Sequence, residues 1–176
     1  MNKETLKTRP DWDAYFMSLA LFVSSRSIDP RTKHGSVLVD NHHRVLSTGY
    51  NGPPKGCYDD MLPLDSDSKY FIMVHSELNA IIQSRTSNTT LDGFKCYVTG
   101  RPCLPCLCHL INAGCTEVIY GPIWSHCVTS EQNDLEKLIL TGQKIKIREY
   151  KDIQKIFNLF NTVTSYLNKK LEAKSS

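Results

Sequence analysis

The sequence lacks a long apolar run and a dense basic cluster. In its 176 residues, no apolar run approaches the length of a membrane-spanning helix. The first dozen residues also lack the apolar segment of a secretion signal. Lys and Arg (21) nearly balance Asp and Glu (18), so the net charge is only +3. A protein that binds nucleic acid through its phosphates usually carries a denser basic patch. We therefore expect neither a membrane protein nor a nucleic-acid binder.

Internal repeats, low-complexity tracts and linkers are also absent from the sequence. The length suits one domain that buries its own core, so we expect residues 1–176 to form a single domain. The cysteines number seven, an odd count that does not suit a secreted disulfide framework. A cytoplasmic location is expected, in the host cytoplasm if the source is viral.

Apolar periodicity predicts alternating helices and strands along the chain. The helices are expected at 12–24, 75–84, 103–113, 131–140 and 152–171, and the strands at 36–40, 44–50, 94–100, 116–121 and 144–150. The first two strands form a hairpin, whereas the later strands are separated by helices, which favours parallel pairing. The fold class is therefore α/β, with a mixed sheet of about five strands.

Two short motifs carry the chemistry. Cys103 and Cys106 of "PCLPC" lie three apart at the start of a predicted helix, and His75 of "HSE" begins another. The positive end of a helix favours the thiolate, which is the form that binds metal. Three protein ligands leave one tetrahedral position open, the arrangement of a catalytic zinc. Glu77, two residues after His75, is the expected general acid and base.

The cysteine pair also has three alternative roles, the simplest of which is a buried pair of small apolar residues. A redox pair normally follows a strand in a thioredoxin-like context, which this chain lacks. A structural zinc with four ligands is the stronger alternative, because Cys57 could supply the fourth ligand, whereas Cys108 should point away from the first turn. The combination of His-x-Glu with Pro-Cys-x-x-Cys is the signature of zinc-dependent nucleobase deaminases and favours catalysis.

From residue 11 to residue 121 the chain resembles the deoxycytidylate deaminase family, within the cytidine deaminase superfamily. The stretches that carry the likeness are "DWDAYFMSLALFVSSRSIDP", "GYNGPPKG", "HSELNAI", "RPCLPC" and "GCTEVIYG". The resemblance implies a three-layer α/β/α fold and hydrolysis of dCMP to dUMP for thymidylate synthesis. It also implies a homohexamer, with activation by dCTP and inhibition by dTTP.

Further site residues follow from the resemblance. Asn51 matches an asparagine that holds the sugar and the pyrimidine edge; alternatively, it supports a left-handed turn before Gly52. Arg26 and Ser27 lie in "RSIDP", and a guanidinium suits a monophosphate, although a solvated arginine at a helix end is equally plausible. Lys33 is a second candidate for the phosphate.

Effector binding is expected at the glycine-rich loop that follows the hairpin. Gly52 and Gly56 would offer backbone N–H groups and Lys55 a positive charge to an effector triphosphate, which could carry Mg²⁺. The alternative is a plain connection whose glycines and prolines only set its turns. The apolar stripe of the last helix (152–171) is expected to cover one face of the sheet; the alternative is a contact with another subunit.

The chain departs from the family pattern at four places. Ser76 replaces the usual alanine, His34 replaces a valine, Leu107 and Cys108 follow the second cysteine, and the segment 122–129 differs. Because relatives close this last segment over the substrate, a modified cytosine nucleotide is an alternative substrate. A tRNA or single-stranded DNA deaminase and a non-catalytic zinc protein are the remaining function classes, disfavoured by the modest charge and by Glu77 respectively.

Overall fold

The computed structural model describes residues 9–121 and 129–175. The helices are α1 (Trp12–Ser24), α2 (Ser76–Thr86), α3 (Leu104–Asn112), α4 (Ser130–Leu140) and α5 (Ile153–Ser175). The strands are β1 (Gly35–Val39), β2 (Val45–Tyr50), β3 (Lys95–Val98), β4 (Glu117–Tyr120) and β5 (Lys146–Glu149). Each predicted element is present within a few residues of its expected ends. In the described ranges, no helix has both the length and the apolar character needed to cross a bilayer.

The five strands form one mixed sheet in the order β2-β1-β3-β4-β5. Strand β1 is antiparallel to both of its neighbours, whereas β3, β4 and β5 run parallel. The predicted α/β class and mixed sheet are confirmed. The hairpin accounts for the antiparallel edge, and the helices between later strands provide the crossovers that parallel pairing needs.

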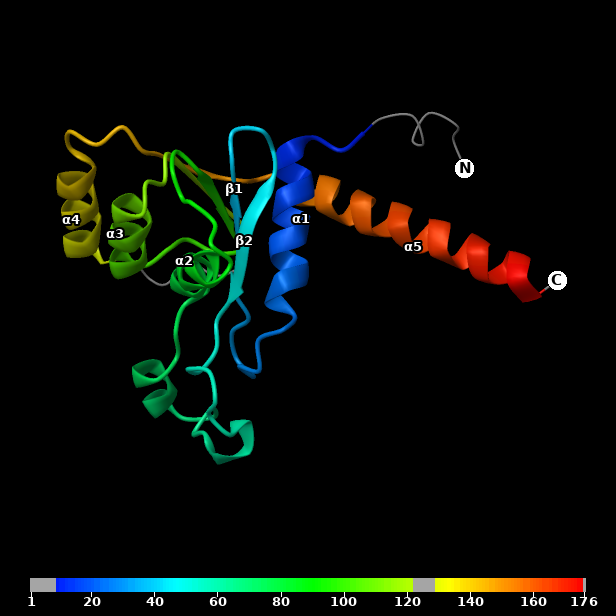
Figure 1. Cartoon of the computed structure of the whole chain (residues 1–176), viewed down its shortest axis with the longest axis horizontal. Helices are drawn as coiled ribbons and strands as arrows, with labels where there is room; N and C mark the ends of the chain where they lie inside the picture. The colour runs from blue at the N-terminus through cyan, green and yellow to red at the C-terminus, as the bar shows by residue number, and fades with distance from the viewer. Residues whose placement is uncertain (1–8, 122–128, 176) are drawn as a thin grey trace.

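Helices cover both faces of the sheet and make three layers (Figure 1). Alternation along β1 divides its side chains between two cores: Val37 and Val39 pack with α1, whereas Leu38 packs with α2 and α3. At Gly49 of β2, an added Cβ would lie 2.3 Å from the backbone nitrogen of Ala80 in α2. Only glycine permits this approach, so the start of α2 is held tightly against the sheet.

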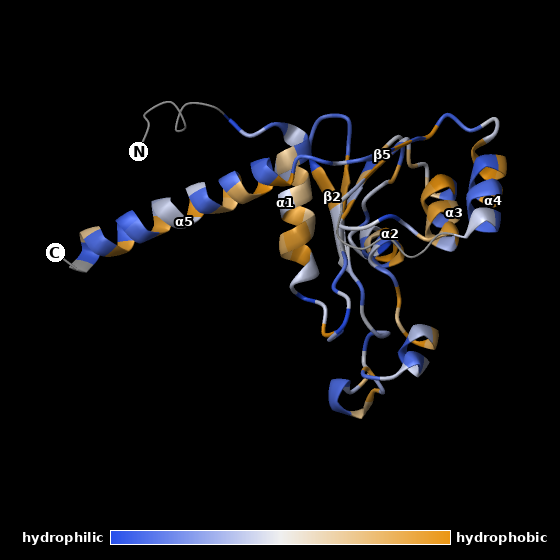
Figure 2. Ribbon diagram, turned by 180° about the vertical axis from the view of Figure 1, so that it is seen from behind, coloured by the Kyte–Doolittle hydropathy of each residue, from blue (hydrophilic) through white to orange (hydrophobic). Residues whose placement is uncertain are grey.

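Helix α5 does not cover the sheet, so that prediction is wrong. It contacts α1 near its first turns, where Ile156 is buried, and then projects away from the body of the molecule (Figure 1). Its apolar and polar residues alternate along the projecting part (Figure 2). Seven large apolar side chains of α5 are exposed: Ile153, Phe157, Phe160, Val163, Tyr166, Leu167 and Leu171.

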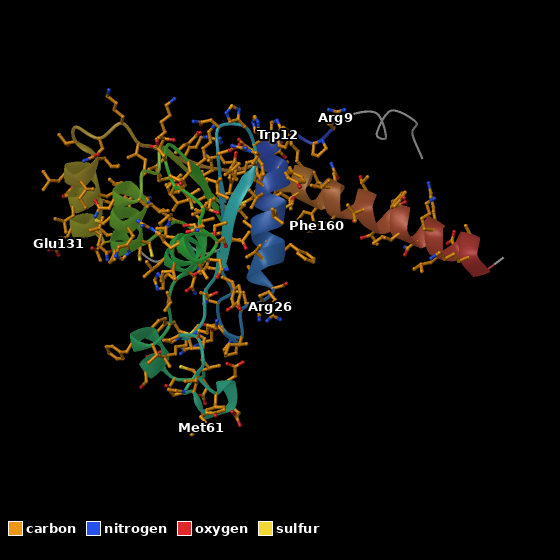
Figure 3. The ribbon with its side chains drawn as sticks, in the orientation of Figure 1. Arg9, Trp12, Arg26, Met61, Glu131 and Phe160 are labelled. Carbon is orange, nitrogen blue, oxygen red and sulfur yellow. The ribbon has the colours of Figure 1, made fainter. Side chains whose placement is uncertain are left out.

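A second projection connects β2 to α2. Residues 57–72 contain two 3₁₀ turns, η1 (Asp59–Met61) and η2 (Asp67–Phe71), and extend from the end of the molecule opposite the hairpin turn (Figure 1). Met61 lies near its far end (Figure 3). At the base of this projection, Gly52 and Val74 form an isolated antiparallel bridge. The bridge brings the chain back to the sheet just before α2 begins.

Candidate active site

The N-termini of two helices supply the predicted metal ligands. His75 is the N-cap residue of α2, and Cys103 is the N-cap residue of α3, with Cys106 in the first turn of α3. Pro105 occupies the same turn, where no N–H partner is lost. Both capping residues have extended backbone, which turns the chain into each helix beside the sheet. The structure therefore brings together three residues that are separated by up to 31 positions.

The distances in this cluster fit a zinc ion. The Nδ1 atom of His75 lies 3.4 Å from the Sγ of Cys103 and 3.4 Å from that of Cys106. Tetrahedral zinc, with bonds of about 2.0 Å to nitrogen and 2.3 Å to sulfur, places these donors about 3.5 Å apart. The donor atoms all lie within 4.8 Å of one another, and no other such cluster is found in the described residues.

The structure offers no fourth protein ligand among the residues that it describes. Cys57 is exposed and Cys108 is half-buried, and neither belongs to the cluster. Cys96 and Cys115 lie in the apolar core, as expected for small buried residues. The open position is thus consistent with a catalytic site rather than a structural one.

The surroundings of Cys103 favour its thiolate form. The Cys106 thiol and the His75 ring lower the pKa of Cys103 to about 4, against the effect of burial. The hydrogen bond with Cys103 in turn raises the pKa of His75. A thiolate beside the N-terminal ends of α2 and α3 is ready to bind a cation.

Glu77 lies in the first turn of α2 and is 5% exposed. Burial raises the pKa of its carboxyl group, so it holds a proton more readily than a surface glutamate. The hydroxyl of Ser76 donates to Oε2 of Glu77 at 3.0 Å. The Oγ atoms of Ser36 and Ser76 are hydrogen-bonded at 2.7 Å. Glu77 is outside the ligand cluster but shares a cavity with His75 and Cys103. This is the placement that a proton-transfer group needs.

Loops beyond the cluster build the rest of the cavity wall. The lining includes Asp29, Thr32, His34, Asn51, Tyr70 and Arg101. The Asn51 side chain accepts from the N–H of His34 at 2.7 Å and donates to the carbonyl of Thr32 at 2.9 Å. Asn51 has no positive φ, so the left-handed turn is wrong. One N–H and one lone pair of its amide remain for a ligand.

The three residues predicted to bind phosphate do not line this cavity. Arg26 is exposed just beyond the end of α1, with its guanidinium 5.9 Å from the centre of the Tyr50 ring (Figure 3). Ser27 is buried, and its hydroxyl accepts from the N–H of Asp29. The ammonium of Lys33 donates to the carbonyl of Ser27. Their contact with substrate stays a prediction.

Arg101 is a cavity residue that sequence reasoning missed. Its guanidinium donates to Glu136 of α4 at 2.8 Å and lies 5.8 Å from the centre of the Tyr120 ring. Arg101 directly precedes the Pro-Cys motif. Its closeness in sequence to the ligand Cys103 could have indicated that it lies at the site. It brings a fixed positive charge to the wall that contains Glu77 and His75.

A buried ion pair was also missed. Lys69 of η2 and Asp29 lie 2.5 Å apart with exposed side-chain fractions of 0% and 4%. A fully buried lysine is rare, and the polar stretch around Lys69 looked irregular. Nothing in the sequence joined that stretch to the turn at Asp29.

The predicted effector loop is only partly available to a ligand. The N–H of Gly52 donates to the carbonyl of Val74, and its own carbonyl accepts from the N–H of Val74. Lys55 is exposed, and Gly56 has a φ of 91°. Gly52 therefore cannot offer its N–H to an anion while the bridge persists. The segment expected to close over the substrate (122–129) lies almost wholly outside the described residues.

Comparison with known proteins identifies relatives across the whole chain. Residues 10–122 match the family described as the cytidine and deoxycytidylate deaminase zinc-binding region. The chain is similar to deoxycytidylate deaminase of Homo sapiens, with 32% identity covering 98% of this chain and 100% of that protein. For the Mus musculus deoxycytidylate deaminase the identity is 33%, over 85% of this chain and 87% of that protein.

Solved structures show the same fold. The crystal structure of dCMP deaminase from the cyanophage S-TIM5 in complex with dCMP and dUMP superposes with a TM-score of 0.62. The two sequences are 22% identical, and the match covers 81% of this chain and 99% of that chain. The apo form of the same phage protein gives a TM-score of 0.63.

Proposed function

The chain belongs to the cytidine and deoxycytidylate deaminase family, and we propose that it hydrolyses dCMP to dUMP and ammonia. The family membership and the His75, Cys103 and Cys106 cluster make it a zinc-dependent deaminase. The single observation that carries the proposal is the placement of buried Glu77 in one cavity with two of these ligands. The product would supply dUMP for thymidylate synthesis.

The reaction consumes one water and breaks the C4–N4 bond of cytosine. Zinc held by the cluster would supply a hydroxide nucleophile near neutral pH. Glu77 accepts a proton from the water and delivers it to N3 of the ring, then accepts the second proton from the hydroxyl formed at C4 and delivers it to the departing amine. Asn51 keeps one N–H and one lone pair to orient the pyrimidine or the sugar.

A mononucleotide is the favoured substrate class, because the cavity wall contains the cation Arg101 and the whole chain carries little net charge. The test is ammonia release from cytosine, deoxycytidine, dCMP, dCTP, 5-methyl-dCMP, 5-hydroxymethyl-dCMP and a cytosine-containing oligonucleotide. We expect dCMP to give the highest kcat/KM. Equal efficiency on deoxycytidine and dCMP would contradict a phosphate-selective site, and a clear preference for the modified nucleotides or the oligonucleotide would favour those alternatives.

Two groups of residues are candidates for the contact with the 5′-phosphate. Arg26 and Lys33 are the candidates from sequence, whereas Arg101 is the cation that lines the described cavity. A remote phosphate contact contributes mainly uniform binding, so its loss raises KM more than it lowers kcat. Arg26→Ala, Lys33→Ala and Arg101→Ala, assayed with dCMP and deoxycytidine, identify the residue whose loss removes the preference for dCMP.

Regulation by dCTP and dTTP is part of the proposal. The exposed Lys55 and the positive φ of Gly56 support an anion site in the loop 53–56, with Mg²⁺ on the effector phosphates. Lys55→Glu should weaken both responses and leave effector-free turnover nearly unchanged. Turnover at subsaturating dCMP that ignores millimolar dCTP and dTTP would mean that the loop is only a connection.

A homo-oligomer, with a hexamer as the specific expectation, completes the proposal. Its support is the exposed apolar side of α5, together with Phe22 of α1, which is 70% exposed. Light scattering after size-exclusion chromatography gives the mass in solution. A mass of one chain at micromolar concentration would contradict it.

A further inference from the structure

The buried pair of Asp29 and Lys69 has no role in the chemistry described above, although Asp29 lines the cavity. Asp29 belongs to the turn between α1 and β1, and Lys69 belongs to the projection that precedes α2. Removing an ammonium group from water costs several kcal/mol, which a good partner offsets only in part. A pair of this kind with one member in a cavity wall therefore points to a function beyond packing.

The two oxygens of Asp29 have different surroundings. Oδ1 accepts three hydrogen bonds, from the ammonium of Lys69 at 2.5 Å and from the N–H groups of Arg31 and Thr32 at 2.8 and 3.0 Å. Oδ2 accepts none from the part of the chain that the structure describes, and Asp29 lines the same cavity as Glu77 and His75. The carboxylate thus keeps one acceptor for a ligand.

The carboxylate is also fixed in direction. Three donors on one oxygen leave the group little freedom to rotate, and Lys69 is itself fully buried. The same turn continues to the carbonyl of Thr32, which accepts from the Asn51 side chain. Lys69 therefore stabilises the turn that carries Asp29, and Asn51 is hydrogen-bonded to Thr32 of the same turn.

The chemistry of Oδ2 selects the group that it can bind. An ionised oxygen accepts hydrogen bonds and repels phosphate, so it does not bind the 5′-phosphate. The reacting amine of cytosine must lie at Glu77 and the ligand cluster. On a nucleotide this leaves a sugar hydroxyl as the donor.

We propose that Asp29 accepts a hydrogen bond from the sugar hydroxyl of the substrate and that Lys69 is the positioning residue that holds Asp29 for this contact. The inference rests on the proposed function for its substrate class. It divides the cavity into a sugar end at Asp29 and a phosphate end elsewhere. Asp29 then discriminates nucleotides by their sugar, and Lys69 acts only through it.

The test compares dCMP with 2′,3′-dideoxycytidine 5′-monophosphate, which lacks the hydroxyl. A charge-assisted hydrogen bond is strong, so the wild-type protein should prefer dCMP by about tenfold or more in kcat/KM. Asp29→Asn keeps an oxygen for the three Oδ1 donors but replaces Oδ2 with an amide nitrogen, and the preference should fall to about threefold or less. Asp29→Asn/Lys69→Met removes the unpaired ammonium and should show the same loss.

Controls separate this outcome from misfolding and from failure of the proposed function. Asp67→Asn makes the same chemical change in the exposed partner of Arg31 and should leave the ratio unchanged. Thermal unfolding checks each variant, and calorimetric titration with dUMP and its 3′-deoxy analogue measures the hydroxyl contact without turnover. If the wild type does not deaminate dCMP, the proposed function fails, and the titration still decides the contact.

Two results overturn the proposal. One is a wild-type ratio near one in both kinetics and titration. The other is a folded Asp29→Asn or double variant that keeps the wild-type ratio, since Asp29 and Lys69 would then only stabilise the turn. If neither variant folds, the wild-type ratio decides alone: tenfold or more supports the contact, and anything smaller counts against it.

Discussion

The start of α2 and the length of α5 differ in opposite ways from an ordinary protein surface. At the start of α2, polar side chains are buried: Ser76 is 0% exposed and Glu77 is 5% exposed. Along α5, apolar side chains are in solvent, with Phe157 58% exposed and Leu167 53% exposed. Both arrangements are costly in an isolated chain. A polar group that is buried without a hydrogen-bond partner loses its hydration, and an apolar side chain in solvent loses the free energy of burial. The first has its compensation inside the molecule, in the hydrogen bonds and the metal site. The second has none in the described chain.

Removal of a metal ligand is expected to give the largest effect, and this effect should be limited to the site at the start of α2. Cys103→Ala should lose both bound zinc and detectable turnover, because two remaining ligands leave the site incomplete. Cys108→Ala is the matched control, since Cys108 lies in the same helix but outside the cluster, and it should retain both. Metal content by mass spectrometry and ammonia release are the measurements. A Cys103→Ala protein with one zinc per chain would disprove this ligand set.

Replacement of Glu77 separates chemistry from metal binding within the same region. Glu77→Gln should retain zinc, fold and dCMP binding, yet turnover should fall by about 10²–10⁴-fold, because the amide cannot transfer protons. Turnover, metal content and thermal unfolding are compared with the wild type. Retention of more than a tenth of the wild-type rate would mean that another group transfers the protons.

The same contrast explains what could be predicted from sequence. The ligands and Glu77 were predictable because zinc and proton transfer restrict both residue type and spacing. The periodicity of residues 152–171 predicted a helix with an apolar side, but not what that side contacts, since an apolar stripe can pack on a sheet or on another subunit. The prediction for α5 was wrong for this reason.

The cavity wall was the hardest part to predict. Lys69 and Asp29 are 40 positions apart, and the bridge at Gly52 and the ion pair of Arg31 with Asp67 help to hold their two segments together. Arg101 contacts Glu136, which lies 35 positions later in α4. The sequence predicts that helix but not which way it faces in the fold. Contacts between loops depend on tertiary geometry rather than on local pattern, so Arg26 and Lys33 were favoured by motif alone.

Changes on α5 test whether the second region is independent of the first. Val163→Ser/Leu167→Ser should leave zinc content unchanged and alter the free energy of unfolding of a single chain by about 0.5 kcal/mol or less, as for exposed positions. The mass in solution should fall if α5 makes the subunit contact. Leu107→Ser is the comparison variant, because Leu107 is a buried apolar residue beside the site. It should lower the free energy of unfolding by several kcal/mol. An unchanged mass would remove α5 from the interface.

Ser76→Ala should give the smallest effect at the site, although Ser76 touches the catalytic carboxyl. The change removes the hydrogen bond to Glu77 and leaves the buried hydroxyl of Ser36 without that partner, which should cost about 1 kcal/mol of stability. Turnover should fall less than tenfold, because the ligands and Glu77 remain in place.

The double variant Ser36→Ala/Ser76→Ala distinguishes the two consequences. It removes both hydroxyls, so no buried donor is left unpaired and most of the lost stability should return. The turnover of Ser76→Ala should not return, since Glu77 still lacks its donor. Thermal unfolding and kcat are measured on the same preparations. If Ser76→Ala lowered kcat as much as Glu77→Gln does, the serine would take part in proton transfer itself, and the buried polar region would extend its catalytic role from Glu77 through Ser76 into the sheet at Ser36.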